Sequence, residues 1–287
     1  FRAIGGKVTI KRDGMAVVNY LLPLQLGECS NNGIICREGI CYLKVGRTYT
    51  NPIISDKSVP DPTVVRANDG HFYLYATQTS TYWMPIYRSK DLVNWEYQKT
   101  AFTQATKPSL SGGGAFWAPE MQYINGKYVL YFSWAKMNGA DVSYTAVAVS
   151  DSPLGPFPNS KALITNEEFG SNAIDQFYYE ENGKKYMFFG SFKGIYVTEL
   201  TDDGLSVKRD AKGKPVLKKQ ICGNLFEGTN IYKKNGYYYL FASIGNCCNG
   251  VNSSYKVVVG RSQDLLGPYV DKKGKSMLDN SWELVLE

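Results

Sequence analysis

The stretch that decides the fold is GHFYLYATQTS at residues 70–80, a glycine turn followed by a tyrosine-rich strand. Three further stretches follow the same plan, and each leads into a second strand of small and β-branched residues: NGKYVLYFSWA (125–135), NGKKYMFFGSF (182–192) and NGYYYLFASIG (235–245). The repeats recur at intervals of roughly 50 to 60 residues, which is close to the length of one four-stranded propeller blade.

The strands of the repeats alternate apolar with polar or small positions, as half-buried antiparallel strands do. Asn-Gly pairs at 125–126, 182–183 and 235–236 stand where a tight hairpin turn needs positive φ. No segment shows a helical period over more than about two turns. We therefore predict an all-β propeller rather than a β-sandwich, whose turns recur every 8 to 12 residues or so.

Composition agrees with a folded β-protein and excludes other classes. The chain has 287 residues, of which 44% are hydrophobic and 14% aromatic, with 22 tyrosines. It contains no apolar run of about 18 residues, so no transmembrane helix is expected. The net charge of +6 is spread along the chain, which argues against nucleic-acid binding.

The six cysteines fall in two groups of three, without the spacing of a zinc site: Cys29, Cys36, Cys41, Cys222, Cys247 and Cys248. Disulfides in an oxidising compartment fit this pattern, but the pairing stays open, and Cys247 and Cys248 bond to each other, pair elsewhere or stay reduced. The only histidine, His71, stands at a predicted hairpin turn, where we expect no catalytic role. The apolar segment 15–26 is too short for a convincing signal peptide, so the signal of an exported protein would have been removed before residue 1.

Each repeat is preceded by a segment that opens with an acidic residue near Pro, Gly or Gln and continues into β-forming residues: VPDPTVV (59–65), FWAPEMQYI (116–124), NAIDQFYYE (172–180) and FEGTNIYKK (226–234). The innermost strand of every propeller blade lines the central channel, so acidic side chains distant in sequence converge there. Asp61, Asp175 and Glu227 form such a set, and Glu120 is a fourth candidate in register.

Carboxyl groups in different protonation states are what glycosidic hydrolysis requires. One carboxyl group donates a proton to the leaving oxygen, and another activates water or attacks; a third nearby raises the pKa of the acid. Taken singly, each of these residues also reads as a turn former beside Pro or Gly. The repeat by itself does not choose among the four.

From about Asn51 to its end the chain resembles glycoside hydrolase family 43, in particular its arabinanase-like branch. The motifs that carry the resemblance are VPDPTVVRANDGHFYLYATQ (59–78), FWAPEMQYINGKYVLYFS (116–133), NAIDQFYYEENGKKYMFFGSFKGI (172–195) and FEGTNIYKKNGYYYLF (226–241). The resemblance implies a five-bladed propeller in which Asp61 is the general base, Asp175 modulates the pKa of the acid and Glu227 is the general acid. It further implies inversion by single displacement, with base and acid about 6.5 to 9.5 Å apart. Gln176 departs from the family, which commonly has proline after the second aspartate.

Residues 243–274 resemble the fourth blade of α-1,5-L-arabinanases, which implies cleavage of α-L-arabinofuranosidic linkages in plant arabinan or pectin side chains. By the same resemblance Asn172 and Ser191 would bind sugar hydroxyls, and Phe116 and Trp117 would form a stacking wall. Phe116 and Trp117 also read as core aromatics, and Ser191 as an ordinary strand residue. A β-xylosidase or fructan hydrolase and a non-catalytic glycan-binding propeller are the alternatives.

Four blades are readable in residues 51–287, and the fifth is either incomplete or supplied by the segment 1–50, whose role is open. The chemistry requires no cofactor. Arabinanase-like relatives hold a metal ion, often calcium, in the channel, but its ligands are not identifiable in this chain, so no metal-binding residue is predicted. We expect a monomer that is secreted, periplasmic or at the cell surface, acts on polysaccharide or oligosaccharide, and binds neither nucleic acid nor a membrane by a spanning segment.

Overall fold

The computed structural model describes residues 6–10, 16–20, 34–37, 40–43, 51–55, 57–111, 114–136 and 142–287. The chain divides into two compact units, Phe1–Lys57 and Ser58–Glu287. The predicted boundary between residues 50 and 51 lies seven residues before this division. Most of segment 15–26 and Cys29 lie outside the described residues, and the role of residues 1–50 stays a prediction.

The first unit contains one four-stranded antiparallel sheet with strand order β1-β2-β4-β3. Its strands are β1 (Gly6–Ile10), β2 (Ala16–Tyr20), β3 (Ile34–Arg37) and β4 (Ile40–Leu43). In backbone register, Cys36 lies opposite Cys41 across the β3–β4 pair.

The second unit consists of four antiparallel four-stranded sheets, each built from strands that follow one another in the chain. Blade 1 comprises β5 (Thr63–Arg66), β6 (Phe72–Tyr75), β7 (Pro85–Ser89) and β8 (Trp95–Thr100). Blade 2 comprises β9 (Ala115–Ile124), β10 (Lys127–Ala135), β11 (Ser143–Ser150) and β12 (Lys161–Thr165). Blade 3 comprises β13 (Phe177–Glu181), β14 (Lys184–Phe189), β15 (Ile195–Leu200) and β16 (Lys219–Cys222). Blade 4 comprises β17 (Glu227–Lys234), β18 (Tyr237–Ile244), β19 (Lys256–Ser262) and β20 (Glu283–Leu286).

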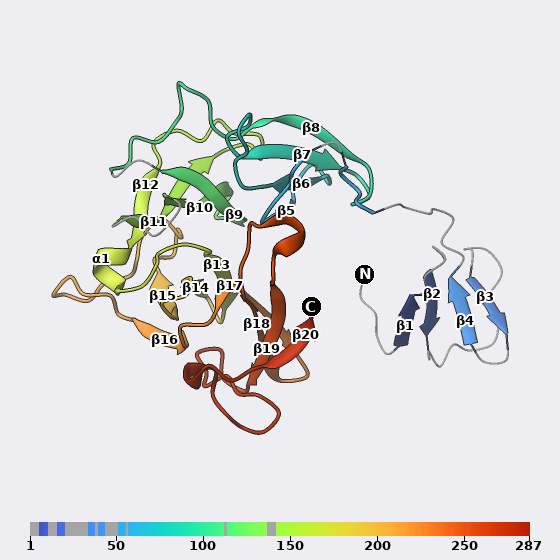
Figure 1. Cartoon of the computed structure of the whole chain (residues 1–287). Helices are drawn as coiled ribbons and strands as arrows, with labels where there is room; N and C mark the ends of the chain where they lie inside the picture. Colours follow the sequence, from blue (N-terminus) through green and yellow to red (C-terminus); the bar gives the residue numbers. More distant parts are fainter. Residues whose placement is uncertain are drawn as a thin grey trace. The chain divides into compact units, whose positions relative to one another are not determined.

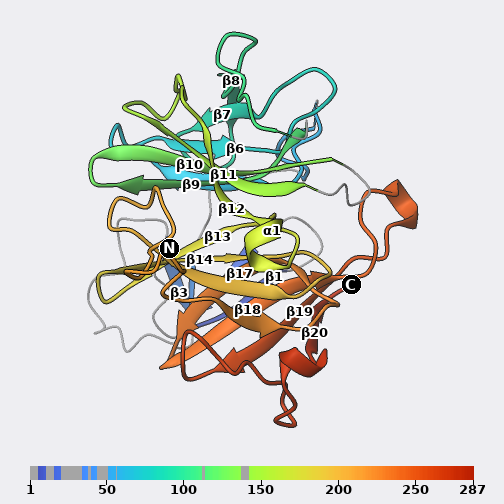
Figure 2. The same cartoon turned by 90° about the vertical axis from the view of Figure 1, so that its left-hand side faces the viewer.

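The first strands of the blades lie around the middle of the unit (Figure 1), where β5 contacts β9, β9 contacts β13 and β13 contacts β17. Figure 2 shows the blades following one another in chain order, from β6–β8 at the top of the view to β18–β20 at the bottom. The predictions of an all-β propeller and of four readable blades are confirmed.

Helical structure in the described residues is limited to short turns, as the sequence predicts. They are α1 (Asn166–Phe169), η1 (Gly250–Asn252) and η2 (Met277–Asp279). In the described part of the chain no helix is long and apolar enough to cross a membrane.

The hairpin turns of blades 2, 3 and 4 have the backbone geometry that the Asn-Gly pairs predict. Asn125, Asn182 and Asn235 have φ of 49°, 52° and 51°, and each following glycine is also positive. Two consecutive positive φ angles match the twist of the flanking strands. The repeated turns therefore fix the register of the first two strands in each of these blades.

Three hydrophobic clusters hold the blades together, one at each contact between neighbouring blades. The cluster between blades 1 and 2 includes Tyr75, Phe102, Phe116 and Phe132. The clusters between blades 2 and 3 and between blades 3 and 4 likewise contain buried aromatic and aliphatic side chains from both neighbouring blades. Burying one large aromatic side chain contributes about 1.5 to 3 kcal/mol. This packing sets the relative positions of the inner strands, on which the candidate site depends.

Candidate functional site

The three predicted carboxylates lie where the inner strands of blades 1, 3 and 4 begin. Asp61 and Asp175 stand two residues before the first residues of β5 and β13, and Glu227 opens β17. Asp61 and Asp175 have φ of 49° and 56°, a left-handed conformation that aspartate tolerates better than most residues. The chain therefore turns at both residues just before the strand begins.

The Asp175 carboxyl group interacts electrostatically with both of the other carboxyl groups. Burial raises the pKa of Asp175 well above its usual value of 3.8, and the charges of Glu227 and Asp61 raise it further. The Gly228 amide donates a hydrogen bond that acts in the opposite direction. That amide is free to donate because the β17–β18 pairing is irregular between Glu227 and Asn230.

Glu227 is buried, with 8% of the residue exposed. Burial raises its pKa, and the charge of Asp61 adds to the effect. The Ser191 hydroxyl donates to Glu227 Oε2 at 2.7 Å and works against both. Glu227 Oε1 is buried and has no hydrogen-bond partner among the described residues, so this oxygen is left for a ligand.

Asp61 is exposed to solvent and is held by one hydroxyl. Thr77 Oγ1 donates to Asp61 Oδ2 at 2.6 Å and itself accepts the amide hydrogen of Ala118 at 2.7 Å. Water can reach this oriented carboxylate, so Asp61 can accept a proton from water while one of the two enclosed carboxyl groups keeps its own.

Asn172 and Ser191 lie beside Glu227. The Asn172 side-chain amide donates to the carbonyl oxygen of Ser191 at 2.6 Å, and Ser191 forms a backbone bridge with Glu227. Ser191 is 4% exposed, whereas Asn172 is half-buried. Asn172 thus holds the backbone of the residue whose hydroxyl contacts the candidate acid.

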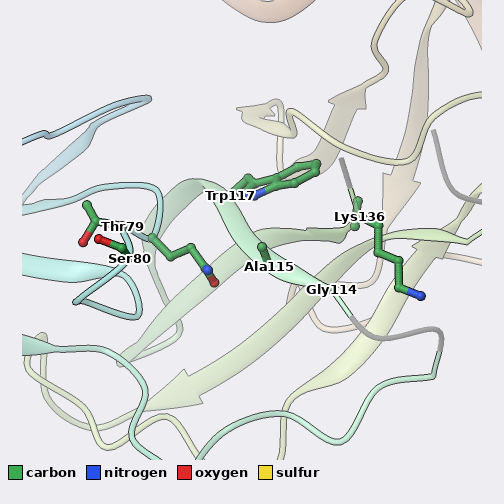
Figure 3. Close-up of a pocket in the computed structure, with 8 residues that line it drawn as sticks. Thr79, Ser80, Gly114, Ala115, Trp117 and Lys136 are labelled. Atoms are coloured by element: carbon green, nitrogen blue, oxygen red, sulfur yellow. The ribbon is translucent and has the colours of Figure 1, made fainter. Parts of the chain in front are cut away.

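Phe116 and Trp117 are adjacent on β9 and point to opposite sides of the strand. Phe116 is 1% exposed and stacks on Phe102 within the core, with ring centroids 4.6 Å apart. Trp117 lines an open pocket together with Gln78, Thr79, Ser80, Gly114, Ala115, Ala135 and Lys136. Thr79 and Ser80 lie on one side of this pocket and Lys136 on the other, with Ala115 and Trp117 between them (Figure 3).

This pocket adjoins the carboxylates through its chain neighbours. Two pocket residues are chain neighbours of the residues that reach Asp61 by hydrogen bonds. Gln78 follows Thr77, which donates to Asp61, and Trp117 precedes Ala118, which donates to Thr77. The structure thus brings Trp117 to the site and places the Phe116 ring in the core.

Glu120 lies apart from the other carboxylates. It accepts hydrogen bonds from the Thr63 hydroxyl at 3.3 Å and from the Gln122 side chain at 2.7 Å. Burial raises its pKa to about 7. Since Thr63 opens β5 two residues after Asp61, Glu120 lies farther along the channel. It is not among the charges that act on Asp175 or Glu227.

His71 lies at the turn between β5 and β6, where its Nδ1 is 3.3 Å from Asp69 Oδ2. Among the residues that the structure describes, no group of three or more His, Cys, Asp or Glu side chains could hold a metal ion.

Cys247 and Cys248 form a disulfide with each other. Cys222 is a buried free thiol.

Sequence reasoning missed four residues whose hydrogen bonds surround the carboxylates. Thr77 and Gly228 donate to the carboxylates of Asp61 and Asp175, Ser133 accepts the backbone amide hydrogen of Asp175, and Gln176 bonds to Ser133. Of these only Gln176 carried a signal, as a departure from the family pattern. Nothing in the local sequence marks the other three residues, because only the folded structure brings them to the carboxylates.

Comparison with known proteins agrees with this geometry. The family model described as Glycosyl hydrolases family 43 matches residues 49–284. The extracellular endo-α-(1→5)-L-arabinanase 1 of Bacillus subtilis (strain 168) is 34% identical over 235 residues, covering 78% of this chain and 71% of the relative. The extracellular exo-α-(1→5)-L-arabinofuranosidase ArbA of Cellvibrio japonicus (strain Ueda107) is 32% identical over 251 residues, covering 80% and 71%.

Solved structures lead to the same family. Native Bacillus subtilis arabinanase Arb43A superposes with a TM-score of 0.65 at 31% identity, covering 80% of this chain and 81% of that chain. The α-L-arabinanase of Cellvibrio cellulosa superposes with a TM-score of 0.64 at 30% identity, covering 81% and 79%. The chain therefore belongs to Glycosyl hydrolases family 43, and it is a glycoside hydrolase.

Proposed function

We propose that this protein cleaves α-L-arabinofuranosidic linkages of arabinan by an inverting single displacement, with Asp61 as general base, Glu227 as general acid and Asp175 as the residue that tunes the acid. The observation that carries the proposal is the electrostatic coupling of these three carboxyl groups, which come from three different blades.

Each group has the environment that its role requires. Asp61 is exposed, so a water molecule can reach its carboxylate, lose a proton to it and attack the anomeric carbon. Glu227 Oε1 gives its proton to the leaving glycosidic oxygen as the bond to that carbon breaks, and the configuration at the carbon inverts. Two carboxyl groups complete this step without a cofactor.

The cluster retains a proton to higher pH than an isolated carboxyl group would. Burial and like charges raise the pKa of both Asp175 and Glu227, because three carboxylates at close range do not all ionise readily. A general acid needs this retained proton near the working pH.

The substrate class rests on the relatives, two of which are named as an arabinanase and an arabinofuranosidase at 34% and 32% identity. Both are named extracellular, which supports secretion of this protein as well. We propose that it acts as a monomer on arabinan or arabino-oligosaccharides outside the cell.

Trp117 would form the wall against which a sugar ring stacks, because it lines the pocket beside Asp61. Phe116 would support Trp117 indirectly, because its stacking on Phe102 anchors β9 in the core. Asn172 and Ser191 would contact sugar hydroxyls next to Glu227, in addition to the hydrogen bonds that they make within the protein.

The proposal is tested by hydrolysis of linear arabinan and of an aryl β-xyloside by the wild type, Asp61→Ala and Glu227→Ala. We expect the wild type to prefer arabinan, and each variant to lose at least about 100-fold in kcat, since positioned acid–base catalysis contributes 10²–10⁴-fold. NMR of the first-formed sugar should show the inverted anomer. Unchanged turnover in either variant contradicts the assigned roles, and preference for the xyloside contradicts the substrate class.

A further inference from the structure

Gln176 joins two blades through its buried side-chain amide. The residue is 6% exposed and stands directly after Asp175. Its Nε2 donates to the carbonyl oxygen of Ala118 on β9, and its Oε1 accepts the Ser133 hydroxyl hydrogen at 3.1 Å from β10. A buried amide with both ends paired has one fixed orientation.

The directions of these hydrogen bonds are set by chemistry. A backbone carbonyl only accepts, so Nε2 must face Ala118 and Oε1 must face Ser133. Ser133 gives its one proton to Gln176 and accepts the amide hydrogen of Asp175 at 3.0 Å. Gln176 and the backbone of Asp175 are therefore held by the same hydroxyl.

The backbone N–H of Ala118 connects to the candidate base, Asp61, through Thr77. The Ala118 amide donates to Thr77 Oγ1 at 2.7 Å, and Thr77 donates to Asp61 Oδ2 at 2.6 Å. A path of hydrogen bonds, joined through the backbone of Ala118, thus runs from the Asp175 amide to the Asp61 carboxylate by way of Ser133, Gln176, Ala118 and Thr77.

Ala118 has an unfavourable backbone conformation within this path. Its φ of 40° lies in the left-handed region, which residues with a Cβ atom rarely adopt. Thr77 holds its N–H and Gln176 holds its C=O. Without the Gln176 contact, one of the two restraints on this unfavourable conformation is gone.

We propose that Gln176 is a positioning residue that fixes Asp61 relative to Asp175 and Glu227, an inference that rests on the proposed function. An inverting hydrolase must keep its base and acid far enough apart for one water molecule. A misplacement of about 1 Å in such a site can lower the rate about 100-fold. Asp61 and Asp175 belong to different blades, and the Gly228 amide, next to the acid Glu227, donates to Asp175. The separation of base and acid therefore depends on the link between Asp61 and Asp175.

A double-mutant cycle tests this coupling with Gln176→Met, which keeps the shape of the side chain and removes both of its hydrogen bonds. We expect the substitution to lower kcat on arabinan about 10-fold and to change KM less than about 2-fold. In a Thr77→Val background the path to Asp61 is already broken, so the same substitution should change kcat less than about 2-fold.

The matched control is Thr198→Val. Thr198 is fully buried in blade 3, and its hydroxyl donates to the Leu217 carbonyl oxygen at 2.8 Å, outside the path. This variant should resemble Gln176→Met in thermal stability and retain the wild-type kcat. An equal loss of kcat from Gln176→Met in both Thr77 backgrounds would show a merely structural role and overturn the proposal.

A second measurement does not depend on any substrate. Hydrogen exchange of the Ala118 amide, followed by NMR, should become at least about 10-fold faster in Gln176→Met and stay unchanged in Thr198→Val. Unchanged exchange of Ala118 in Gln176→Met overturns the positioning role. Absence of arabinan hydrolysis by the wild type would refute the proposed function, and the exchange experiment would still decide whether Gln176 holds the peptide next to Asp61.

Discussion

At the scale of single residues, the state of Glu227 depends on opposing effects: burial raises its pKa, and the Ser191 hydroxyl lowers it. Ser191→Ala removes the lowering effect, so the pKa of Glu227 should rise further. Because the acid works only when protonated, the alkaline limb of the kcat profile should move to higher pH. We expect kcat at the optimum to fall about 10-fold as the carboxyl group loses its orientation.

Measuring kcat on arabinan from pH 4 to 10 checks this prediction, with Thr198→Val as the variant that should leave the profile in place. A shift of the alkaline limb to lower pH in Ser191→Ala would mean that the hydroxyl does not stabilise the ionised form of Glu227.

At the scale of elements, the turn between β14 and β15 places Ser191 and depends on Gly190. Gly190 has φ of 135°, and a Cβ atom there would lie 2.2 Å from the Gly194 carbonyl oxygen. Gly126, in the β9–β10 hairpin, also has positive φ, but a Cβ atom there would meet nothing within 4 Å. Gly126→Ala should therefore lower the free energy of unfolding by about 1 kcal/mol.

Gly190→Ala should lower the free energy of unfolding at least twice as much, about 2 kcal/mol or more, because backbone atoms must also move. It should reduce kcat as well, because Ser191 moves with the turn. Denaturant unfolding and arabinan kinetics on both variants test this. Equal losses of stability, or full activity in Gly190→Ala, would show that the turn does not constrain Ser191.

At the scale of the whole molecule, the carboxylate cluster opposes folding above acid pH. The pKa of Asp175 is raised well above 3.8 in the folded protein, so the folded state binds its proton more tightly than the unfolded chain does. Stability from this group is present below about pH 4 and is lost as pH rises through the raised pKa. Asp175→Asn cannot ionise, so its Tm should exceed that of the wild type near pH 8 and match it near pH 3.5.

Calorimetric Tm values across this pH range provide the test, with the loss of arabinan hydrolysis in Asp175→Asn measured in parallel. Wild-type and Asp175→Asn curves that keep a constant separation from pH 3.5 to 8 would show that Asp175 ionises in the folded protein as it does in water.

Local sequence by itself determined the blades and their turns, because strand alternation and the Asn-Gly pairs need only neighbouring residues to specify them. The repeat also marked four acidic residues where the inner strands begin, and the family resemblance then singled out Asp61, Asp175 and Glu227 over Glu120. Only the tertiary structure placed Glu120 farther along the channel and put Phe116 in the core while Trp117 lines the pocket. It alone connected Gln176 to Asp61 through Ala118 and Thr77. The physical reason is that burial and hydrogen bonding between blades depend on how whole sheets pack, and residues 40 to 60 positions apart carry no local signal of that packing.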